Sequence, residues 1–346
     1  MTIILDAMGS DHHPDAEIEA ALRAAETFGE EIVLVGQEPI LRPKLDALNT
    51  KELPVVIEHA PDVIEMDDKV VEGSRSKRNN SIFVGCRLVK SGRGQAFVSA
   101  GNTGAVMFNA LLALGRIKGV RRPGLTALFP TRTGFCAVVD IGANAECRPE
   151  DLLQFALMGS LYAQKVLKIA RPRIGLISNG EEATKGTPLV KETYPLLEAS
   201  GLNFIGNVEG KELFGGAVDV AVTDGFTGNV MLKAVEAVAG LITDFLKEEL
   251  TASPVTTLGA MLAKPALRKM KRKMDPEEVG AAPLLGIDGL VFKGHGRSKA
   301  PAIFNAIRVA REAVQANLLD EMRQSIQAQL EKAALASAAQ PETETK

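Results

Sequence analysis

The sequence is poor in the features that mark several large classes of protein. Its 346 residues contain no tryptophan and only 4% aromatic residues, and the formal net charge is −3. Nucleic-acid-binding proteins are usually basic and often stack bases on aromatic side chains, so this composition argues against a nucleic-acid partner. The three cysteines, Cys86, Cys136 and Cys147, are scattered along the chain. They form neither a disulfide framework nor a zinc motif, and they fit a reducing compartment.

The chain also lacks a recognisable secretion signal and any long apolar run. Its first residues contain no basic segment, and an aspartate, Asp6, follows almost at once. No apolar stretch approaches the roughly 18–20 residues that a membrane-spanning helix requires. We therefore expect a cytoplasmic protein that is at most peripherally attached to a membrane.

The chain does contain one recurring pattern. Short runs rich in Val, Ile and Leu end in Gly, Asn, Asp or Ser, and an amphipathic stretch follows each run. The apolar runs occupy residues 3–6, 32–36, 55–57, 96–99, 137–140, 174–178, 203–206, 218–222 and 289–292. The expected helices include residues 15–28, 82–90, 105–117, 151–167, 230–250 and 302–330. Apolar strands that alternate with helices indicate an α/β fold with a mostly parallel sheet flanked by helices.

The alternation of apolar runs and amphipathic stretches is interrupted by three prolines, Pro254, Pro265 and Pro276. Proline is common at the first position of a helix, so we expect a cluster of short helices inserted into the α/β body. The predicted organisation is a catalytic body over residues 1–250, an inserted basic amphipathic segment over 251–283, the last strand and C-terminal helix over 284–332, and a flexible tail over 333–346.

Polar loops that follow the apolar runs form the candidate site. They read Asp6-Ala-Met-Gly-Ser-Asp-His12, Ser99-Ala-Gly-Asn-Thr-Gly104, Asp140-Ile-Gly-Ala-Asn144, Ser178-Asn-Gly-Glu-Glu182 with Lys185 nearby, Asp224-Gly-Phe-Thr-Gly-Asn229 and Gly294-His-Gly-Arg-Ser298. Ligands of α/β proteins bind beyond the carboxyl ends of the strands, so we expect these loops to meet at one edge of the sheet. The loops ending at Gly104 and Asn229 lead into long helices, whose free N–H groups bind phosphate or an oxyanion. N-capping by Asn or Thr explains the same residues and is compatible with ligand binding.

Several standard catalytic motifs are absent. The sequence contains no G-x-S-x-G nucleophile elbow, no phosphate-binding P-loop and no G-x-G-x-x-G dinucleotide fingerprint. The four histidines, His12, His13, His59 and His295, lack metal-ligand spacing, so we expect neither a metal nor a cofactor. Cys147 follows a strand end and could accept an acyl group. No neighbouring His or Lys favours its thiolate, and a packing role is the preferred interpretation.

Taken together, these loops resemble the phosphate acyltransferase family of bacterial phospholipid synthesis, whose members act on acyl carrier protein and phosphate. The most specific matches are Ser99-Ala-Gly-Asn-Thr-Gly104, Gly180-Glu-Glu-Ala-Thr-Lys-Gly186 and Asp224-Gly-Phe-Thr-Gly-Asn229. The resemblance extends over nearly the whole chain, from Asp6 to Ser298. Small departures include Ser10, which stands where the family usually has glycine.

The resemblance implies a fold similar to isopropylmalate dehydrogenases and phosphotransacetylases, usually in a homodimer. It also implies a reaction in which a long-chain acyl thioester of acyl carrier protein and inorganic phosphate give acyl phosphate and free carrier protein. The acyl phosphate would then supply a membrane enzyme that acylates glycerol 3-phosphate. Phosphate is already an anionic nucleophile, so this chemistry needs a phosphate cradle and oxyanion donors rather than a catalytic triad.

Site roles follow from the resemblance residue by residue. Lys185 matches a family position that looks catalytic and would neutralise phosphate or polarise the carbonyl, and Asn229 would donate to the oxyanion or fix phosphate. The expected substrate- and phosphate-binding residues are Asp6, Gly9, His12, Asn102, Thr103, Gly104, Asn144, Glu181, Asp224, Thr227, Gly228 and His295.

Three other functions stay open at this point. A short-chain phosphotransacetylase would use coenzyme A thioesters in place of carrier-protein thioesters. A dehydrogenase of the isopropylmalate type would need a nicotinamide cofactor and grouped aspartates for a divalent metal. A non-enzymatic scaffold at the membrane would leave the polar strand ends unexplained.

Residues 254–274 combine positive charge with apolar residues at helical spacing. The basic residues are Lys264, Arg268, Lys269, Lys271, Arg272 and Lys273. Such a helix suits an anionic membrane surface, where a long-chain acyl phosphate must be delivered. Packing on the body or across a dimer, and docking of acyl carrier protein, are the alternatives.

Overall fold

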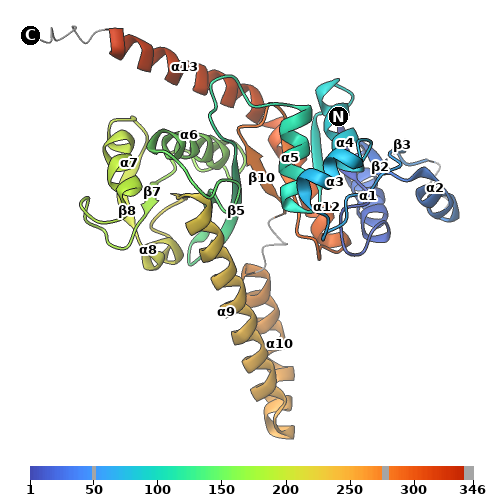
Figure 1. Ribbon diagram of the computed structural model, residues 1–346. Helices are drawn as coiled ribbons and strands as arrows, with labels where there is room; N and C mark the ends of the chain where they lie inside the picture. The colour runs from blue at the N-terminus through green and yellow to red at the C-terminus, as the bar shows by residue number, and fades with distance from the viewer. Residues whose placement is uncertain (49–51, 275–279, 339–346) are drawn as a thin grey trace, which may run out of the picture.

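A computed structural model of the protein describes the backbone of residues 1–48, 52–274 and 280–338, and the side chains of residues 1–48, 52–270 and 280–331. The strands are β1 (Thr2–Asp6), β2 (Glu31–Gly36), β3 (Val55–His59), β4 (Ala96–Ser99), β5 (Gly124–Thr131), β6 (Gly134–Val139), β7 (Ile174–Ile177), β8 (Phe204–Val208), β9 (Val220–Val222), β10 (Ala282–Leu285) and β11 (Leu290–Lys293). Within the described residues they form one sheet in the order β3-β2-β1-β4-β11-β10-β5-β6-β9-β7-β8 (Figure 1). The predicted α/β fold with a mostly parallel sheet is confirmed.

Two groups of parallel strands make up this sheet. β3, β2, β1, β4 and β11 form the first group, and β6, β9, β7 and β8 form the second. Between the groups, β10 is antiparallel to β11 and β5, and β5 is antiparallel to β6. Three antiparallel steps reverse the strand direction, so the site loops of the two groups leave opposite edges of the sheet. The expectation of a single shared edge is therefore wrong.

Helices cover both faces of the sheet. They are α1 (Asp15–Phe28), α2 (Glu38–Ala47), α3 (Val70–Ser76), α4 (Ser81–Lys90), α5 (Thr103–Ala113), α6 (Pro149–Lys165), α7 (Pro188–Glu198), α8 (Gly210–Gly215), α9 (Gly225–Thr251), α10 (Pro254–Met274), α12 (Ala300–Gln315) and α13 (Leu318–Ala338). Successive residues of a strand point to opposite faces. Ile3 and Leu5 thus join the core that includes α1, α6 and α12, whereas Ile4 joins the core that includes α4 and α5. None of the described helices is long and apolar enough to cross a membrane.

Helices α9 and α10 form a hairpin that projects from the body (Figure 1). α10 begins at Pro254, as the sequence predicts, and Ser253 Oγ accepts a hydrogen bond from Thr256 N at 3.2 Å. The helix then continues through Pro265, where the prolines had suggested a cluster of short helices. A proline inside a helix removes one backbone hydrogen bond, and packing along α9 holds the two halves of α10 together. The third proline signal, at residue 276, lies outside the described residues.

The C-terminal region differs from the sequence prediction in two places. The single helix expected over residues 302–330 is divided into α12 and α13. Asn317 lies between them with a φ of 52°, in the left-handed region that interrupts a right-handed helix. α13 extends to Ala338, so residues 333–338 of the expected tail are helical, and residues 339–346 lie outside the described part.

Candidate active site

The first group of strands brings three predicted loops together. β1, β4 and β11 are neighbours, so the loops that begin at Asp6, Ser99 and Gly294 leave the sheet side by side. Asp6 is buried, and its Oδ2 accepts a hydrogen bond from Ser99 Oγ at 2.6 Å. A side chain at Gly9 would place its Cβ 2.7 Å from Gly101 N, so the two loops approach too closely for any residue other than glycine.

A buried glutamate supports the first of these loops. Glu17 of α1 is fully buried, and its Oε1 accepts a hydrogen bond from Ser10 N at 3.1 Å. Burial, with a smaller contribution from the charge of Asp6, raises the pKa of Glu17 to about 7. Glu17 Oε2 has no hydrogen-bond partner among the described residues. Sequence reasoning missed this residue, because a single glutamate in an amphipathic helix looks like an exposed one.

The second loop of this group leads into α5 as predicted. Asn102 Oδ1 accepts a hydrogen bond from Ala105 N at 3.0 Å, and Asn102 Nδ2 donates to Met66 O at 2.9 Å. Asn102 therefore caps α5, while Thr103, which is exposed, and Gly104, which is partly exposed, begin its first turn. The capping interpretation is confirmed, and a phosphate role for this turn stays a prediction.

His12 lies on the loop that follows β1, and His295 lies on the loop that follows β11. Both side chains are exposed. His12 N donates to Ser10 Oγ at 3.2 Å. His295 Nδ1 accepts a hydrogen bond from Arg297 N at 3.3 Å. Partial burial and the positive charge of Lys293 lower the pKa of His295, so its imidazole is neutral at neutral pH.

Lys293 is a residue of this group that sequence reasoning missed. It is the last residue of β11, it lies in register with Ser99, and it is only partly exposed. Burial, and then the charge of Lys233 on α9, lower the pKa of Lys293 to about 8. The sequence signal was available, since Lys293 is the one charged residue of an otherwise apolar strand.

The second group of strands brings together the other three loops. β6, β9 and β7 are neighbours, and their last residues are followed by the loops at Asp140, Asp224 and Ser178. The buried Asp140 carboxylate accepts hydrogen bonds from the backbone amides of Leu125, Gly142, Ala143 and Asn144, and from Asn144 Nδ2. Burial raises the pKa of Asp140, and these five N–H donors oppose that shift.

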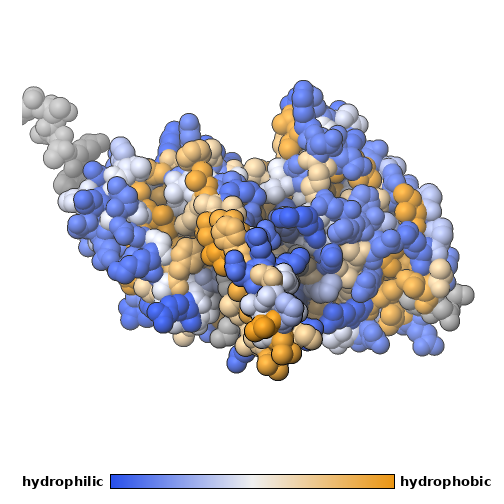
Figure 2. Space-filling view, turned by 90° about the horizontal axis from the view of Figure 1, so that it is seen from below, coloured by the Kyte–Doolittle hydropathy of each residue, from blue (hydrophilic) through white to orange (hydrophobic). Residues whose placement is uncertain are grey.

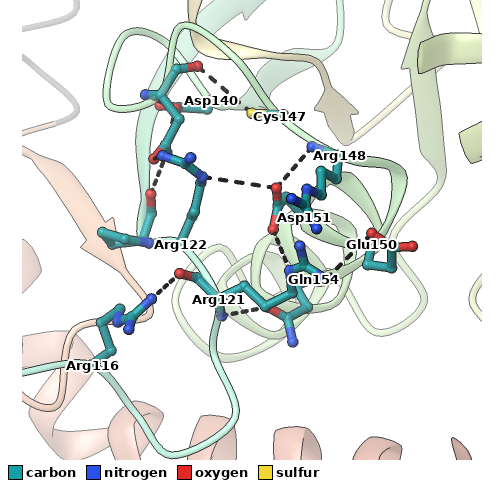
Figure 3. A network of polar contacts seen from close by, with 11 residues as sticks. Arg116, Arg121, Arg122, Asp140, Cys147, Arg148, Glu150, Asp151 and Gln154 are labelled. Atoms are coloured by element: carbon teal, nitrogen blue, oxygen red, sulfur yellow. Dashed lines mark hydrogen bonds and ion pairs between the residues drawn. The ribbon is translucent and has the colours of Figure 1, made fainter. Parts of the chain in front are cut away.

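Asn144 stabilises the conformation of the Asp140 loop. Its Nδ2 donates to Pro123 O at 2.6 Å as well as to Asp140 Oδ2 at 2.9 Å. Both amide hydrogens are therefore used within the chain, and the residue is buried. Figure 3 shows Arg121 and Arg122 near this loop, and both approach Asp151 at the start of α6.

The start of α9 docks directly on the Asp140 loop. Asp224 caps the helix, since its Oδ1 accepts from Thr227 N and its Oδ2 from Thr227 Oγ1, both at 2.8 Å. A Cβ at Gly228 would lie 1.9 Å from Asp140 O, so only glycine permits this contact. Asn229 Nδ2 donates to Ile141 O at 3.3 Å. The Asp224–Asn229 motif thus places Asn229, in the second turn of α9, against the Asp140 loop.

Lys185 and Glu181 lie on the loop between β7 and α7, and both are exposed. Asn207 of β8 anchors this loop, because its Nδ2 donates to Glu182 O at 2.8 Å. Lys185 Nζ forms neither a hydrogen bond nor an ion pair with any residue in the described part of the chain. The buried oxygens Ser178 Oγ and Asn207 Oδ1 also lack partners there. Sequence reasoning had not assigned either of these last two residues.

Helix α9 connects the two groups of loops. Asn229, Lys233 and Glu236 are spaced so that they share one face of the helix. Lys233 and Glu236 lie close enough to Lys293 and His295 to influence their pKa values. The face from Asn229 to Glu236 covers about two turns of α9, roughly 10 Å along the axis.

Burial disfavours the thiolate form of the cysteines. Cys147 Sγ donates to Asn144 O at 3.6 Å. Burial, and then the nearby charge of Asp140, raise the pKa of Cys147 to about 12, so its thiol stays protonated at neutral pH. Among the described residues, no group of three His, Cys, Asp or Glu side chains has the arrangement of a metal site.

Comparison with known proteins decides the family. A family model described as "Fatty acid synthesis protein" matches residues 1–321. A phosphate acyltransferase of Elusimicrobium minutum is 49% identical over 327 residues, which cover 94% of this chain and 96% of that protein. The chain belongs to the phosphate acyltransferase family. A phosphate acyltransferase of Pelotomaculum thermopropionicum is 48% identical over 94% of this chain and 95% of that protein. The predicted family and acyltransferase class are thereby confirmed.

Solved structures share the fold of this phosphate acyltransferase at low sequence identity. The EutD phosphotransacetylase from Staphylococcus aureus matches with a TM-score of 0.61 and 16% identity, over 91% of this chain and 94% of that one. A 4-hydroxythreonine-4-phosphate dehydrogenase from Klebsiella pneumoniae matches with a TM-score of 0.51 and 14% identity, over 91% and 98%. The expected likeness to phosphotransacetylases is confirmed, and the likeness to isopropylmalate dehydrogenases stays a prediction.

Proposed function

We propose that this phosphate acyltransferase transfers a long-chain acyl group from acyl carrier protein to inorganic phosphate. A phosphate oxygen attacks the thioester carbonyl carbon, and a tetrahedral intermediate forms. Its collapse breaks the C–S bond, and the carrier-protein thiolate leaves and takes up a proton. The products are acyl phosphate and free carrier protein, with no acyl-enzyme intermediate.

One observation carries this proposal. The site offers Lys185, which has no partner among the described residues, on the loop between β7 and α7, and an amide donor, Asn229, near the start of α9, while the nearby thiol of Cys147 stays protonated. Such a set of groups can hold an anionic nucleophile and stabilise an oxyanion, and the protonated thiol of Cys147 disfavours an acyl-enzyme at this cysteine. In this scheme Lys185 balances the phosphate charge and Asn229 donates to the oxyanion.

Hydroxylamine trapping of acyl phosphate tests the reaction. Purified protein is mixed with phosphate and either palmitoyl carrier protein or acetyl coenzyme A, and the hydroxamate is measured. We expect hydroxamate with the carrier-protein thioester and little with acetyl coenzyme A. The reverse preference would favour a short-chain phosphotransacetylase, and hydroxamate from neither substrate would refute the proposal.

The α9–α10 hairpin suggests how the product reaches a membrane. Its tip and α10 expose large apolar side chains, with Val255 80% and Leu262 79% exposed (Figure 2). The basic residues Lys264, Arg268 and Lys269 follow on α10 and are exposed too. The side chains of the other predicted basic residues, Lys271, Arg272 and Lys273, lie outside the described part. We propose that α10, with its apolar residues toward the tip and its basic residues toward the body, binds an anionic membrane surface reversibly along its length, since each basic residue near such a surface contributes about 1 kcal/mol.

A homodimer is the second part of this proposal. The middle of α9 exposes Val238, Leu241, Ile242 and Phe245, which are 51–58% exposed in the single chain. Soluble proteins rarely leave such a contiguous apolar surface open to water, so we propose that the same surface of a second copy covers it. A dimer would also present two membrane-binding tips side by side.

Vesicle sedimentation and ultracentrifugation test these two surfaces separately. Changing Lys264, Arg268 and Lys269 to Glu is expected to abolish binding to phosphatidylglycerol vesicles while sparing turnover. Changing Phe245 to Glu is expected to give a monomer. If the triple variant binds vesicles normally but loses turnover with carrier protein, α10 is a carrier-protein contact instead. A dimer that survives Phe245→Glu places the contact between copies elsewhere.

A further inference from the structure

We propose that Asn207 of β8 is a positioning residue for Lys185, which it holds through the carbonyl oxygen of Glu182. The proposal rests on the acyl transfer proposed above, in which Lys185 balances the charge of the phosphate. Asn207 is buried beneath the loop of Lys185, so it acts on the reaction through the place and direction of the lysine side chain.

The turn from Glu182 to Lys185 gives the first argument. Glu182 O accepts two hydrogen bonds, one from Lys185 N at 2.9 Å and one from Asn207 Nδ2 at 2.8 Å. The first bond closes the turn, and the second ties the turn to a strand of the sheet. Lys185 and Asn207 thus share one acceptor atom, and loss of the Asn207 amide frees the turn that carries the lysine.

Close contacts with two glycines fix the rest of this loop. A Cβ at Gly180 would lie 2.8 Å from Lys185 Cγ, so the stem of the lysine crosses the bare backbone of Gly180. Gly186 has a φ of 97°, in the left-handed region that favours glycine, and a Cβ there would lie 3.0 Å from Ser178 Oγ. The loop therefore returns to the end of β7 directly after Lys185, and Asn207 is its link to β8.

Asn207 is also an unfavourable residue for stability at its position. It is 5% exposed, it pairs in register with the buried Leu176 of β7, and its Oδ1 has no hydrogen-bond partner among the described residues. A buried polar atom without a partner lowers stability, and an apolar side chain of similar size avoids that loss. Such a residue is better explained by its effect on Lys185 than by a contribution to folding.

Asn207→Val provides the main test, because valine suits a buried strand and lacks the amide. A displacement of about 1 Å at a catalytic group can lower the rate about 10²-fold, so we expect kcat to fall about 10- to 100-fold. The KM for acyl carrier protein should not change. The melting temperature should equal that of the wild type or exceed it, since Glu182 O keeps Lys185 N as a donor. A lower melting temperature at an unchanged kcat would mean a structural role and overturn the proposal.

Asn203→Ala is the matched control. Asn203 Nδ2 donates to Arg171 O at 3.2 Å, so this residue also makes an amide-to-carbonyl hydrogen bond, just before β8 and at the end of the strand away from Lys185. Its kcat should equal that of the wild type. Equal losses of kcat in both variants would attribute the effect to a general weakening of β8 and refute the proposal. Should Asn207→Val fail to fold, Asn207→Ala serves in its place.

A double-mutant cycle tests whether Asn207 acts through Lys185. In a Lys185→Ala background, Asn207→Val should lower kcat no further, because the group that Asn207 positions is gone. Additive losses would show that Asn207 acts independently of Lys185.

Hydrogen exchange separates this inference from the proposed reaction. The backbone amide of Lys185 should exchange faster in Asn207→Val, while the amides of β8 keep their wild-type rates. If this amide exchanges faster while the wild type forms no acyl phosphate, the positioning stands and the proposed reaction fails. An unchanged exchange rate at Lys185 would overturn the inference even if acyl phosphate forms.

Discussion

Replacing Gly228 by alanine tests whether the contact between α9 and the Asp140 loop positions the active site. The new Cβ would lie 1.9 Å from Asp140 O and 2.9 Å from Asp140 C, and both neighbours are backbone atoms that no rotamer change can move. The helix must therefore retreat by about 1 Å or the loop must distort. Overpacking of this kind costs about 1–3 kcal/mol of stability.

The effect on turnover should exceed the effect on folding. Asn229 follows Gly228 directly and donates to Ile141 O, so any retreat of the helix displaces its amide from the loop. A displacement of about 1 Å at a catalytic group can lower the rate about 10²-fold. We expect acyl phosphate formation by Gly228→Ala to fall by about that factor, with a lower melting temperature and an unchanged circular dichroism spectrum.

Gly240 of the same helix supplies a matched control. A Cβ at this position meets no atom within 4 Å, and alanine favours a helix over glycine by about 1 kcal/mol. Gly240→Ala should therefore keep full activity and melt at the same or a higher temperature. Wild-type activity and stability in Gly228→Ala would refute the argument, and equal losses in both variants would attribute the effect to helix composition.

Other substitutions test the remaining assignments. Lys185→Ala and Asn229→Ala should each lower kcat about 10²- to 10³-fold with the fold intact, and near-normal turnover in both would exclude them from the chemistry. Cys147→Ser should keep most of the activity, because its thiol has a pKa of about 12, and total loss in a folded variant would revive an acyl-enzyme. Glu17 has a folded pKa of about 7 against about 4.5 in the unfolded chain, so the wild type loses stability as the pH rises between these values. The stability of Glu17→Gln relative to the wild type should thus increase by about 3 kcal/mol from pH 4.5 to pH 8 in urea denaturation, and a constant difference would contradict this pKa.

The sequence alone determined the local structure and the family. The cap at Asn102 and the proline at the start of α10 are properties of a few consecutive residues, and α5 and α10 begin at these signals. The helix expected over 230–250 begins earlier, at Gly225, because Asp224 caps it. The loop motifs could be recognised from the sequence, because each is a short run of consecutive residues in a fixed order. Pro265 shows the limit of such rules, since a helix supported by a neighbour continues through it.

Only the tertiary structure decided how the loops face one another. Strand order and direction depend on pairings between distant segments, and two antiparallel strands in the middle of the sheet separated loops that appeared equivalent. The contact of Asn229 with Ile141 joins residues 88 positions apart, and no periodicity predicts it. The partial burial of Lys293 has the same origin. Its neighbours in the sheet come from β4 and β10, and no pattern in the sequence around Lys293 predicts these pairings.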